Sequence, residues 1–371
     1  MKILYYYPEV QSSMFQWQRV HFMDELSRYG HEFEVFNPLE YNSLDEANDS
    51  LIKRIKEGGF DLFFTNLCNK KHLYIEPLLE LQKIGIPSVS FRSDNLIIPF
   101  NDKSLAKYFD IVWITSVETQ RLYEKWGAKV YFAPYAANPF TYSYNKEPLV
   151  KRACFIGSPY GSRPIMMNRL TRAGVKLDVF CGKNENSSSI LTSTAKYSLP
   201  GMTRSELIRG RLSYKEGRKL FLGAFANRIW GEVTIENNAN VSIKPSVSFE
   251  DLSKTYSSYN LSIAYTSSEQ TDVLRNPLKI IDLRNFEIPM CGGIEICRYN
   301  KELASYFDEG KEIVFYKTND ELVEKAKYYI EKASDAEIRS IKEAARLRAE
   351  NEHNWFVRFK GLFQTLGLQN K

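Results

Sequence analysis

Short apolar runs alternate with helical stretches along the chain, and this alternation constrains the fold more than any other feature. In the first half, the runs cover residues 2–7, 33–36, 61–65, 87–91, 110–116 and 129–135. Apolar residues at helical spacing lie between them, and Gly30 ends the predicted helix over 17–29. Repeated β-α-β units with buried strands predict an α/β fold, a parallel sheet with helices on both faces.

A break in this alternation divides the chain. Residues 134–150 hold three prolines and two asparagines, which is typical of a linker. The pattern then restarts with a strand at 152–157, a loop, a helix at 165–174 and a strand at 175–182. A chain of 371 residues is long enough for two domains. We therefore expect Rossmann-like domains over 1–133 and 151–352, the second with an insertion at 183–240.

The rest of the second domain is less regular. We expect a strand at 260–266, a helix from about Pro277 to Glu287, a glycine turn, an apolar run at 294–298 and a strand at 312–316. Two charged helices follow. Residues 353–371 form the last helical segment.

Composition narrows the function classes. The net charge of +5 is too weak to favour nucleic acid as a partner. No apolar run approaches the ~18 residues that a membrane span requires, and no secretory signal pattern opens the sequence. The five cysteines are odd in number and lack CxxC spacing, which favours reduced thiols. We therefore expect a cytoplasmic protein that is able to rest on the inner face of a membrane.

The first candidate motif is GSPYGSR, Gly157 to Arg163, between a strand and a helix. Glycines let backbone N–H groups of Gly157 and Ser158 approach a phosphate, and the helix N-terminus favours an anion. Arg163 could hold a diphosphate with two N–H bonds, and Tyr160 in the same loop is a further candidate contact. An ordinary turn with a surface arginine has the same sequence pattern.

The second motif is LRNFEIPMCGG, Leu283 to Gly293, with a carboxylate just before a glycine turn. Glu287 could accept both hydroxyls of a ribose. Arg284 and Lys279 lie near it and could neutralise phosphates, and Asn276 is another candidate contact. A helix-capping or surface glutamate is the alternative.

The third motif is FRSDN, Phe91 to Asn95, at a predicted strand end. Ligands of open α/β sheets bind at the carboxyl ends of strands, so Asp94 could act as a base or bind a hydroxyl. The alternative is an Asp in an Asx turn. The four histidines show no metal-ligand spacing, and the sequence has no DxD, HExxH or GxSxG motif. We therefore expect no metal site.

Residues 201–228 are locally basic, with seven Arg and Lys against two Glu. Leu220, Phe221, Ala224, Phe225 and Ile229 share one helical face. Such a helix could lie on an anionic membrane, pack onto the second domain, or hold an anionic acceptor.

Several of these segments together resemble one family. FIGSPYGSR, FEDLSKTYSSYNLSIAYT, RNFEIPMCGG, EGKEIVFY and the EHNWFVRF tail resemble, in this order, the C-terminal domain of group-1 glycosyltransferases. The likeness is greatest to the spore-maturation-protein-like branch. LSRYGHEFEVF resembles the family's first helix-strand turn, and APYAANPF resembles its interdomain hinge.

The resemblance implies a GT-B fold, two Rossmann-like domains facing across a cleft. It implies an N-terminal acceptor domain, a C-terminal domain that binds a nucleotide-sugar donor, and a tail helix at 353–371 that crosses back to the first domain. Glu287 would bind the ribose, Gly157 and Ser158 the phosphates, and Arg163 the diphosphate. Many retaining members carry a glutamate where this chain has Lys279. Glu295 shows the same spacing to Glu287 but follows the glycine turn.

We therefore expect a metal-independent glycosyltransferase of cell-surface glycan biosynthesis, with Asp94 and Arg163 as catalytic residues. Its partners would be a nucleotide-diphosphate sugar, as substrate with no other cofactor, and a glycan, lipid-linked or protein acceptor. Peripheral membrane contact fits this reading. An epimerase or phosphorylase on the same fold, or a non-catalytic glycosyltransferase-like binding protein, is the alternative.

Overall fold

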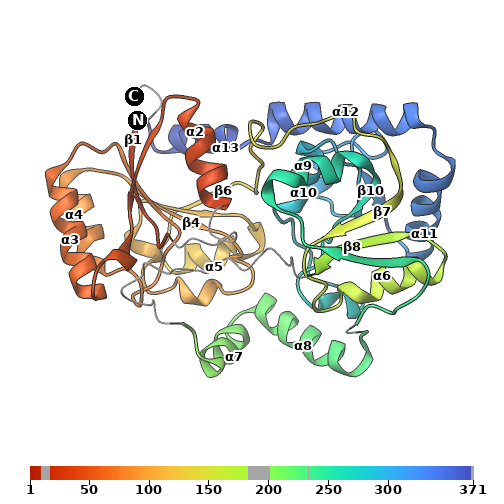
Figure 1. Cartoon of the computed structure of the whole chain (residues 1–371). Helices are drawn as coiled ribbons and strands as arrows, with labels where there is room; N and C mark the ends of the chain where they lie inside the picture. Colours follow the sequence, from red (N-terminus) through yellow and green to blue (C-terminus); the bar gives the residue numbers. More distant parts are fainter. Residues whose placement is uncertain (10–16, 183–200, 233, 369–371) are drawn as a thin grey trace. The chain divides into compact units, whose positions relative to one another are not determined.

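A computed structural model describes residues 1–9, 17–182, 201–232 and 234–368. The chain forms two compact units. Unit 1 comprises Met1–Pro134, Trp355–Lys371 and the segment Ile190–Arg218, of which residues from 201 on are described. Unit 2 comprises Tyr135–Ser189 and Lys219–Asn354. Each unit contains one sheet with helices around it (Figure 1).

The sheet of unit 1 has six parallel strands in the order β2-β1-β3-β4-β5-β6. The strands are β1 Lys2–Tyr6, β2 Glu32–Phe36, β3 Leu62–Thr65, β4 Ser88–Arg92, β5 Ile111–Ile114 and β6 Val130–Phe132. Its α-helices are α2 Glu25–Ser27, α3 Leu44–Glu57, α4 Ile75–Ile84, α5 Gln120–Lys125, α7 Arg204–Leu212 and α13 Trp355–Thr365. Short helical turns occupy η1 Arg19–Asp24, η2 Pro38–Glu40, η3 Pro99–Asn101, η4 Ala106–Tyr108 and η5 Val117–Thr119.

Both faces of this sheet are buried, because side chains of a strand alternate between its two sides. Phe63 belongs to the same hydrophobic core as Leu51 of α3 and Leu81 of α4. The next residue, Phe64, faces the other way, toward α13, where its ring lies 5.4 Å from that of Phe359. Figure 1 shows α3 and α4 on one side of the sheet and α2 and α13 on the other. The predicted parallel sheet with helices on both faces is therefore confirmed in unit 1.

The sheet of unit 2 also has six parallel strands, in the order β12-β11-β10-β7-β8-β9. They are β7 Val150–Ile156, β8 Leu177–Gly182, β9 Val241–Pro245, β10 Tyr259–Ile263, β11 Glu295–Arg298 and β12 Val314–Tyr316. Its helices are α6 Arg163–Arg172, α9 Phe249–Ser258, α10 Arg284–Met290, α11 Asn319–Lys327 and α12 Asp335–Glu352, with short turns η6 Thr271–Val273, η7 Leu303–Ser305 and η8 Tyr328–Lys332. Helices α6, α11 and α12 share one core with the sheet, and α9 and α10 lie across from α6 (Figure 1).

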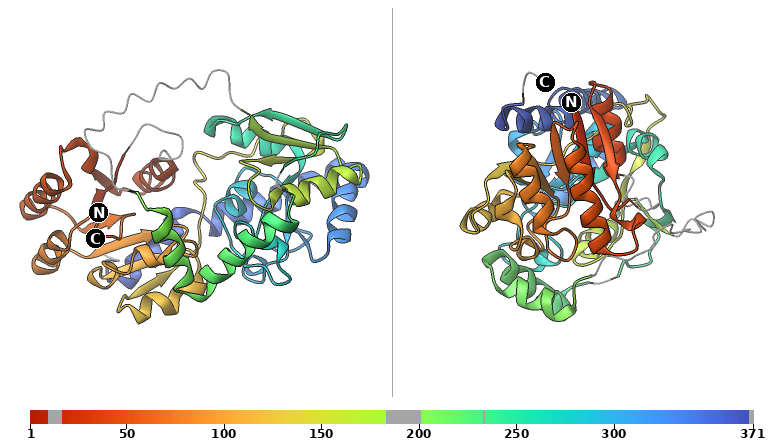
Figure 2. Two further views of the ribbon diagram at one scale, coloured as in Figure 1. Left: turned by 90° about the horizontal axis from the view of Figure 1, so that it is seen from below. Right: turned by 90° about the vertical axis from the view of Figure 1, so that its left-hand side faces the viewer.

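Helix α8, Lys215–Trp230, passes from unit 1 into unit 2. The sequence places the whole insertion 183–240 in the second domain, whereas the described residues 201–218 group with unit 1. Two contacts explain this grouping. Gly210 of α7 lies so close to Phe100 that a Cβ added to Gly210 would be 2.2 Å from the Phe100 ring. The Tyr214 hydroxyl lies 3.0 and 2.8 Å from the backbone oxygens of Leu96 and Ile97. The left view of Figure 2 shows α7 and α8, in green, as two consecutive helices.

Three elements differ from the sequence expectation. The helix predicted over 17–29 contains a wider π-type turn, η1. Strand β9 was not predicted, because an edge strand with half-exposed residues lacks a continuous apolar run. The helix predicted from Pro277 to Glu287 is wrong at its start, since α10 begins at Arg284. There the Asp282 carboxylate accepts the N–H of Arg284, and the Asn285 side chain accepts the N–H of Asp282.

Candidate functional site

Strands β7 and β10 of unit 2 are neighbours in the sheet, although β8 and β9 come between them in sequence. The chain continues from β7 toward one edge and from β10 toward the other. In open α/β sheets, such a switch point leaves a crevice at the carboxyl ends of the two strands, where ligands bind. The loop Gly157–Ser162 follows β7, and Tyr265 follows β10.

Glycine gives the loop after β7 its shape. Gly157 and Gly161 have φ values of 138° and 67°, which L side chains rarely adopt. A Cβ on Gly161 would also lie 2.9 Å from the backbone oxygen of Glu269. The hydroxyl of Ser162 lies 3.1 Å from that same oxygen, so the loop is tied to residues 269–272. The loop leads directly into α6, whose N-terminus presents backbone N–H groups to an anion.

Arg163, the first residue of α6, is held among aromatic rings. Its guanidinium lies 4.3 Å from the ring centroid of Tyr160 and 5.3 Å from that of Tyr265. One of its nitrogens donates to the backbone oxygen of Ser158 at 2.9 Å. Tyr265 in turn donates its hydroxyl to the backbone oxygen of Arg163 at 2.7 Å. The structure therefore brings Gly157, Ser158, Tyr160 and Arg163 together, with a cation whose orientation is fixed by stacking.

Glu287 lies in the middle of α10 rather than at a helix end, and its side chain is 2% exposed. Its Oε2 accepts a hydrogen bond of 2.7 Å from Arg284, one turn earlier. Its Oε1 accepts the hydroxyl of Tyr142 at 2.7 Å. A buried carboxylate with partners on both oxygens is not the surface or capping glutamate of the alternative reading.

Asp282 connects the two motifs. Burial raises the pKa of its carboxyl, and the positive charges of Arg163 and Arg284 oppose that rise. Arg284 also donates its backbone N–H to the Asp282 carboxylate at 2.9 Å, and its side chain is paired with Glu287. The sequence did not single out Asp282, Tyr142 or Tyr265. Asp282 lies two residues before Arg284 and was detectable, whereas the two tyrosines are brought in only by the tertiary fold.

Two other donor candidates lie in the irregular segment before α10. Asn276 is exposed. Lys279 is exposed too, and its ammonium donates to the backbone oxygen of Tyr299 at 2.9 Å. Glu295 begins β11, is buried and accepts a hydrogen bond from Asn285. Burial raises the pKa of Glu295 to about 8, so this carboxyl is mainly protonated at neutral pH.

Asp94 belongs to unit 1, in the turn that follows β4. It is exposed and has a φ of 54°, a conformation in which Asp is enriched among non-glycine residues. Neighbouring residues brace this turn. The Asn95 amide nitrogen donates to the backbone oxygen of Ser116 at 2.8 Å, and the Arg92 side chain forms a buried ion pair with Asp102.

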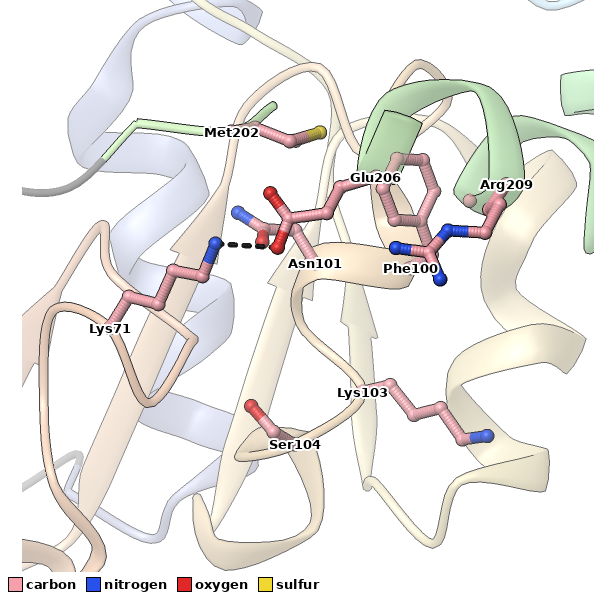
Figure 3. A pocket seen from close by; sticks show the side chains of 9 residues that line it. Lys71, Phe100, Asn101, Lys103, Ser104, Met202, Glu206 and Arg209 are labelled. Carbon is pink, nitrogen blue, oxygen red and sulfur yellow. Dashed lines mark hydrogen bonds and ion pairs between the residues drawn. The ribbon is translucent and has the colours of Figure 1, made fainter. Parts of the chain in front are cut away.

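A pocket of about 620 Å³ lies in unit 1. Its walls come from the loop after β3, the segment after β4, and α7; the lining residues are Lys71, Phe100, Asn101, Lys103, Ser104, Met202, Glu206, Arg209 and Gly210. Figure 3 shows the ion pair of Lys71 with Glu206, whose atoms are 2.8 Å apart. Three basic residues against one acidic residue make this pocket suited to an anionic group.

Comparison with known sequences gives a family match in the C-terminal part of the chain. Residues 213–364 match the glycosyl transferase-like family. This match includes α10 with Arg284 and Glu287, and it confirms the prediction of a glycosyltransferase at the level of enzyme class. No curated protein sequence matches the chain significantly.

Solved structures similar to this chain include three with functions in their descriptions. An alpha-glucosyltransferase in complex with UDP and a DNA 13-mer has a TM-score of 0.62 at 14% identity, covering 99% of both chains. Anabaena Alr3699/HepE, in complex with UDP and glucose, has a TM-score of 0.55 at 13% identity, with 99% of both chains covered. Sucrose-phosphate synthase from Thermosynechococcus elongatus has a TM-score of 0.54 at 12% identity, again over 99% of both chains.

Identities this low show the fold alone. The predicted two-domain, Rossmann-like GT-B fold is thereby confirmed. The resemblance to the spore-maturation-protein-like branch stays a prediction.

Proposed function

We propose that the protein transfers a sugar from a nucleoside diphosphate to a hydroxyl of an anionic, membrane-associated glycan or lipid-linked acceptor. The observation that carries this proposal is the arrangement of Arg163, Asp282, Arg284 and Glu287 at the switch point of unit 2. Alr3699/HepE and the alpha-glucosyltransferase were solved with UDP, which makes a uridine diphosphate sugar the first donor to test.

In this proposal, the Gly157–Ser158 amides and Arg163 bind the diphosphate, and Glu287 binds the ribose. Arg163 exchanges its bond to the Ser158 carbonyl for bonds to the diphosphate, while Tyr160 and Tyr265 keep the guanidinium oriented. Negative charge grows on the diphosphate as the glycosidic bond breaks, so cations placed there in advance lower the barrier. Asn276 and Lys279 stay candidate donor contacts from the sequence.

The acceptor is assigned to unit 1. Asp94 would accept the proton of the attacking hydroxyl, and the pocket lined by Lys71, Lys103 and Arg209 would hold an acidic group of the acceptor. Lys103→Glu should therefore raise the acceptor KM about ten-fold or more while leaving donor affinity unchanged. An unchanged acceptor KM would remove this pocket from the acceptor site.

A cytoplasmic reaction on a growing cell-surface glycan is part of the proposal. The five cysteines are all free, which supports a reducing compartment. The absence of DxD from the sequence supports metal independence, since Arg163 can supply the positive charge. We expect full transferase activity in EDTA. A complete loss of activity in EDTA that Mn²⁺ or Mg²⁺ restores would contradict metal independence.

The deciding experiment has two stages. A thermal-shift screen across nucleoside diphosphates and their sugars identifies the donor, because a ligand of the native state raises Tm. Release of the nucleoside diphosphate is then measured with and without candidate acceptors. Transfer predicts acceptor-dependent release with a glycosylated product. Conversion of the donor into another nucleotide sugar without an acceptor would indicate an epimerase, and binding without turnover would indicate a binding protein.

A further inference from the structure

Helix α8 exposes a row of large apolar side chains. The exposed fractions are 40% for Phe221, 56% for Leu222, 61% for Phe225, 54% for Ile229 and 74% for Trp230. Residues 221, 222, 225 and 229 follow at helical spacing and lie on one side, which we name the α8 apolar face, and Trp230 ends the helix beside it. Single exposed apolar residues are normal, but a contiguous row of this kind marks an interaction surface.

The opposite side of α8 already holds the helix to unit 2. Leu220 and Ala226 are buried there. A Cβ on Gly223 would lie 3.0 Å from Thr271, and the Asn227 side chain donates to the backbone oxygen of Gly161 at 3.3 Å. The sequence grouped Leu220 with Phe221 on one face, and that grouping is wrong, since Leu220 points inward. The α8 apolar face is therefore not needed to dock the helix on unit 2.

The charged residues of α8 that lie along the apolar face are basic. Arg218 precedes Phe221 by one turn on the same side, and Lys219 and Arg228 lie along the same stretch. From Gly217 to Trp230 the chain has no acidic residue. A second copy of this chain would place these cations against one another, which disfavours self-association through this face. An anionic lipid surface complements both the apolar and the basic residues.

We infer that the α8 apolar face docks on an anionic lipid bilayer. Phe221, Phe225 and Ile229 enter the interfacial region, and Trp230 lies at headgroup level, where tryptophan is enriched. Arg218 and Arg228 contact lipid phosphates. Among the described residues, no helix has the length and hydropathy of a membrane span. The inferred lipid contact stands independently of the proposed sugar transfer.

The test is co-sedimentation of the full chain with vesicles of phosphatidylcholine alone or with phosphatidylglycerol at 40 mol% (roughly the high end of anionic content). We expect binding to the anionic vesicles that weakens as salt rises. Phe225→Ser with Ile229→Ser should weaken binding at least ten-fold, and Arg218→Glu with Arg228→Glu should do the same. Matched controls are Leu347→Ser, at a residue 62% exposed on α12, and Lys332→Glu, at an exposed lysine.

No binding to anionic vesicles at low salt would overturn the inference, as would equal effects of the α8 and control substitutions. Light scattering tests the alternative that a second copy of the chain covers the α8 apolar face. The inference would also be overturned if the protein were a dimer that did not bind vesicles and that Phe225→Ser with Ile229→Ser dissociated. Transfer to an acceptor in solution is measured on the same variants and should not change. Vesicle binding without any sugar transfer would count against the proposed function alone.

Discussion

The hydroxyl of Tyr142 donates a 2.7 Å hydrogen bond to Oε1 of Glu287, a residue 145 positions later in the chain. Tyr142 is itself fully buried, and Arg284 occupies the other oxygen of the same carboxylate. The carboxylate is thus held in one orientation from two sides. Such rigid positioning is what a hydrogen-bond acceptor for a ribose requires.

Glu287→Ala should weaken donor binding by about 2–4 kcal/mol, because two charge-assisted hydrogen bonds to the ribose are lost. Calorimetry with the preferred donor measures this change. Tyr142→Phe is the graded comparison, since it keeps the carboxylate and removes one of its bonds, and its effect should be smaller. Unchanged affinity in a folded Glu287→Ala variant would remove Glu287 from the donor site.

Arg163→Ala should lower kcat by roughly 10²-fold or more, with a smaller effect on donor affinity, because Arg163 acts most strongly on the charge that develops in the transition state. Arg172→Ala is the control on the same helix, where the arginine pairs with Glu232 and Glu236 instead. Steady-state kinetics distinguishes the roles. A rise in KM with kcat intact would mean that Arg163 binds the ground state and transition state equally.

Gly210→Ala should detach α7 from the segment after β4, since the added Cβ would lie 2.2 Å from the Phe100 ring. Overpacking of this kind costs about 1–3 kcal/mol. Hydrogen exchange in α7 should become faster, and the acceptor KM should rise because the pocket loses a wall. Gly201→Ala, where a Cβ meets nothing within 4 Å, should change neither quantity.

Glu295→Gln should change how stability depends on pH. Burial raises the pKa of Glu295 from about 4.5 to about 8, so the folded protein retains a proton that the unfolded chain releases. The contribution of this group to stability is full below about pH 4.5 and is lost as pH rises toward 8. The variant should therefore gain stability relative to the native protein between pH 5 and 9 (roughly the span of the shift). Parallel stability curves for the two proteins in urea would contradict the raised pKa.

Periodicity was sufficient to predict most strands of the two sheets, because a parallel strand covered on both faces is a mostly apolar run. It failed at β9, an edge strand with alternating exposure, and at residues 277–283, where Asp282 and Asn285 start α10 later than the apolar spacing suggests.

The loop of the candidate site was predictable as well, because Gly157 and Gly161 adopt φ values that few other residues tolerate. Tyr142 and Tyr265 were not predictable, since a tyrosine in a linker or after a strand carries no local signal of a partner 145 or 102 residues away. The exposure of Phe225 was not predictable either, because helical spacing identifies an apolar face but does not show whether a neighbouring element covers it.

The last helix has a consequence for how the protein is made. Trp355 and Phe359 of α13 pack against Phe22 and Trp113, with ring centroids 4.7 and 5.1 Å apart. The carboxylate of Glu25 accepts the backbone N–H of Phe356 at 2.7 Å. One face of the first sheet is therefore covered in part by Trp355 and Phe359, which are synthesised after all of unit 2. All six strands of unit 2 are synthesised before α13, so unit 2 can complete its sheet while that face of unit 1 still lacks α13.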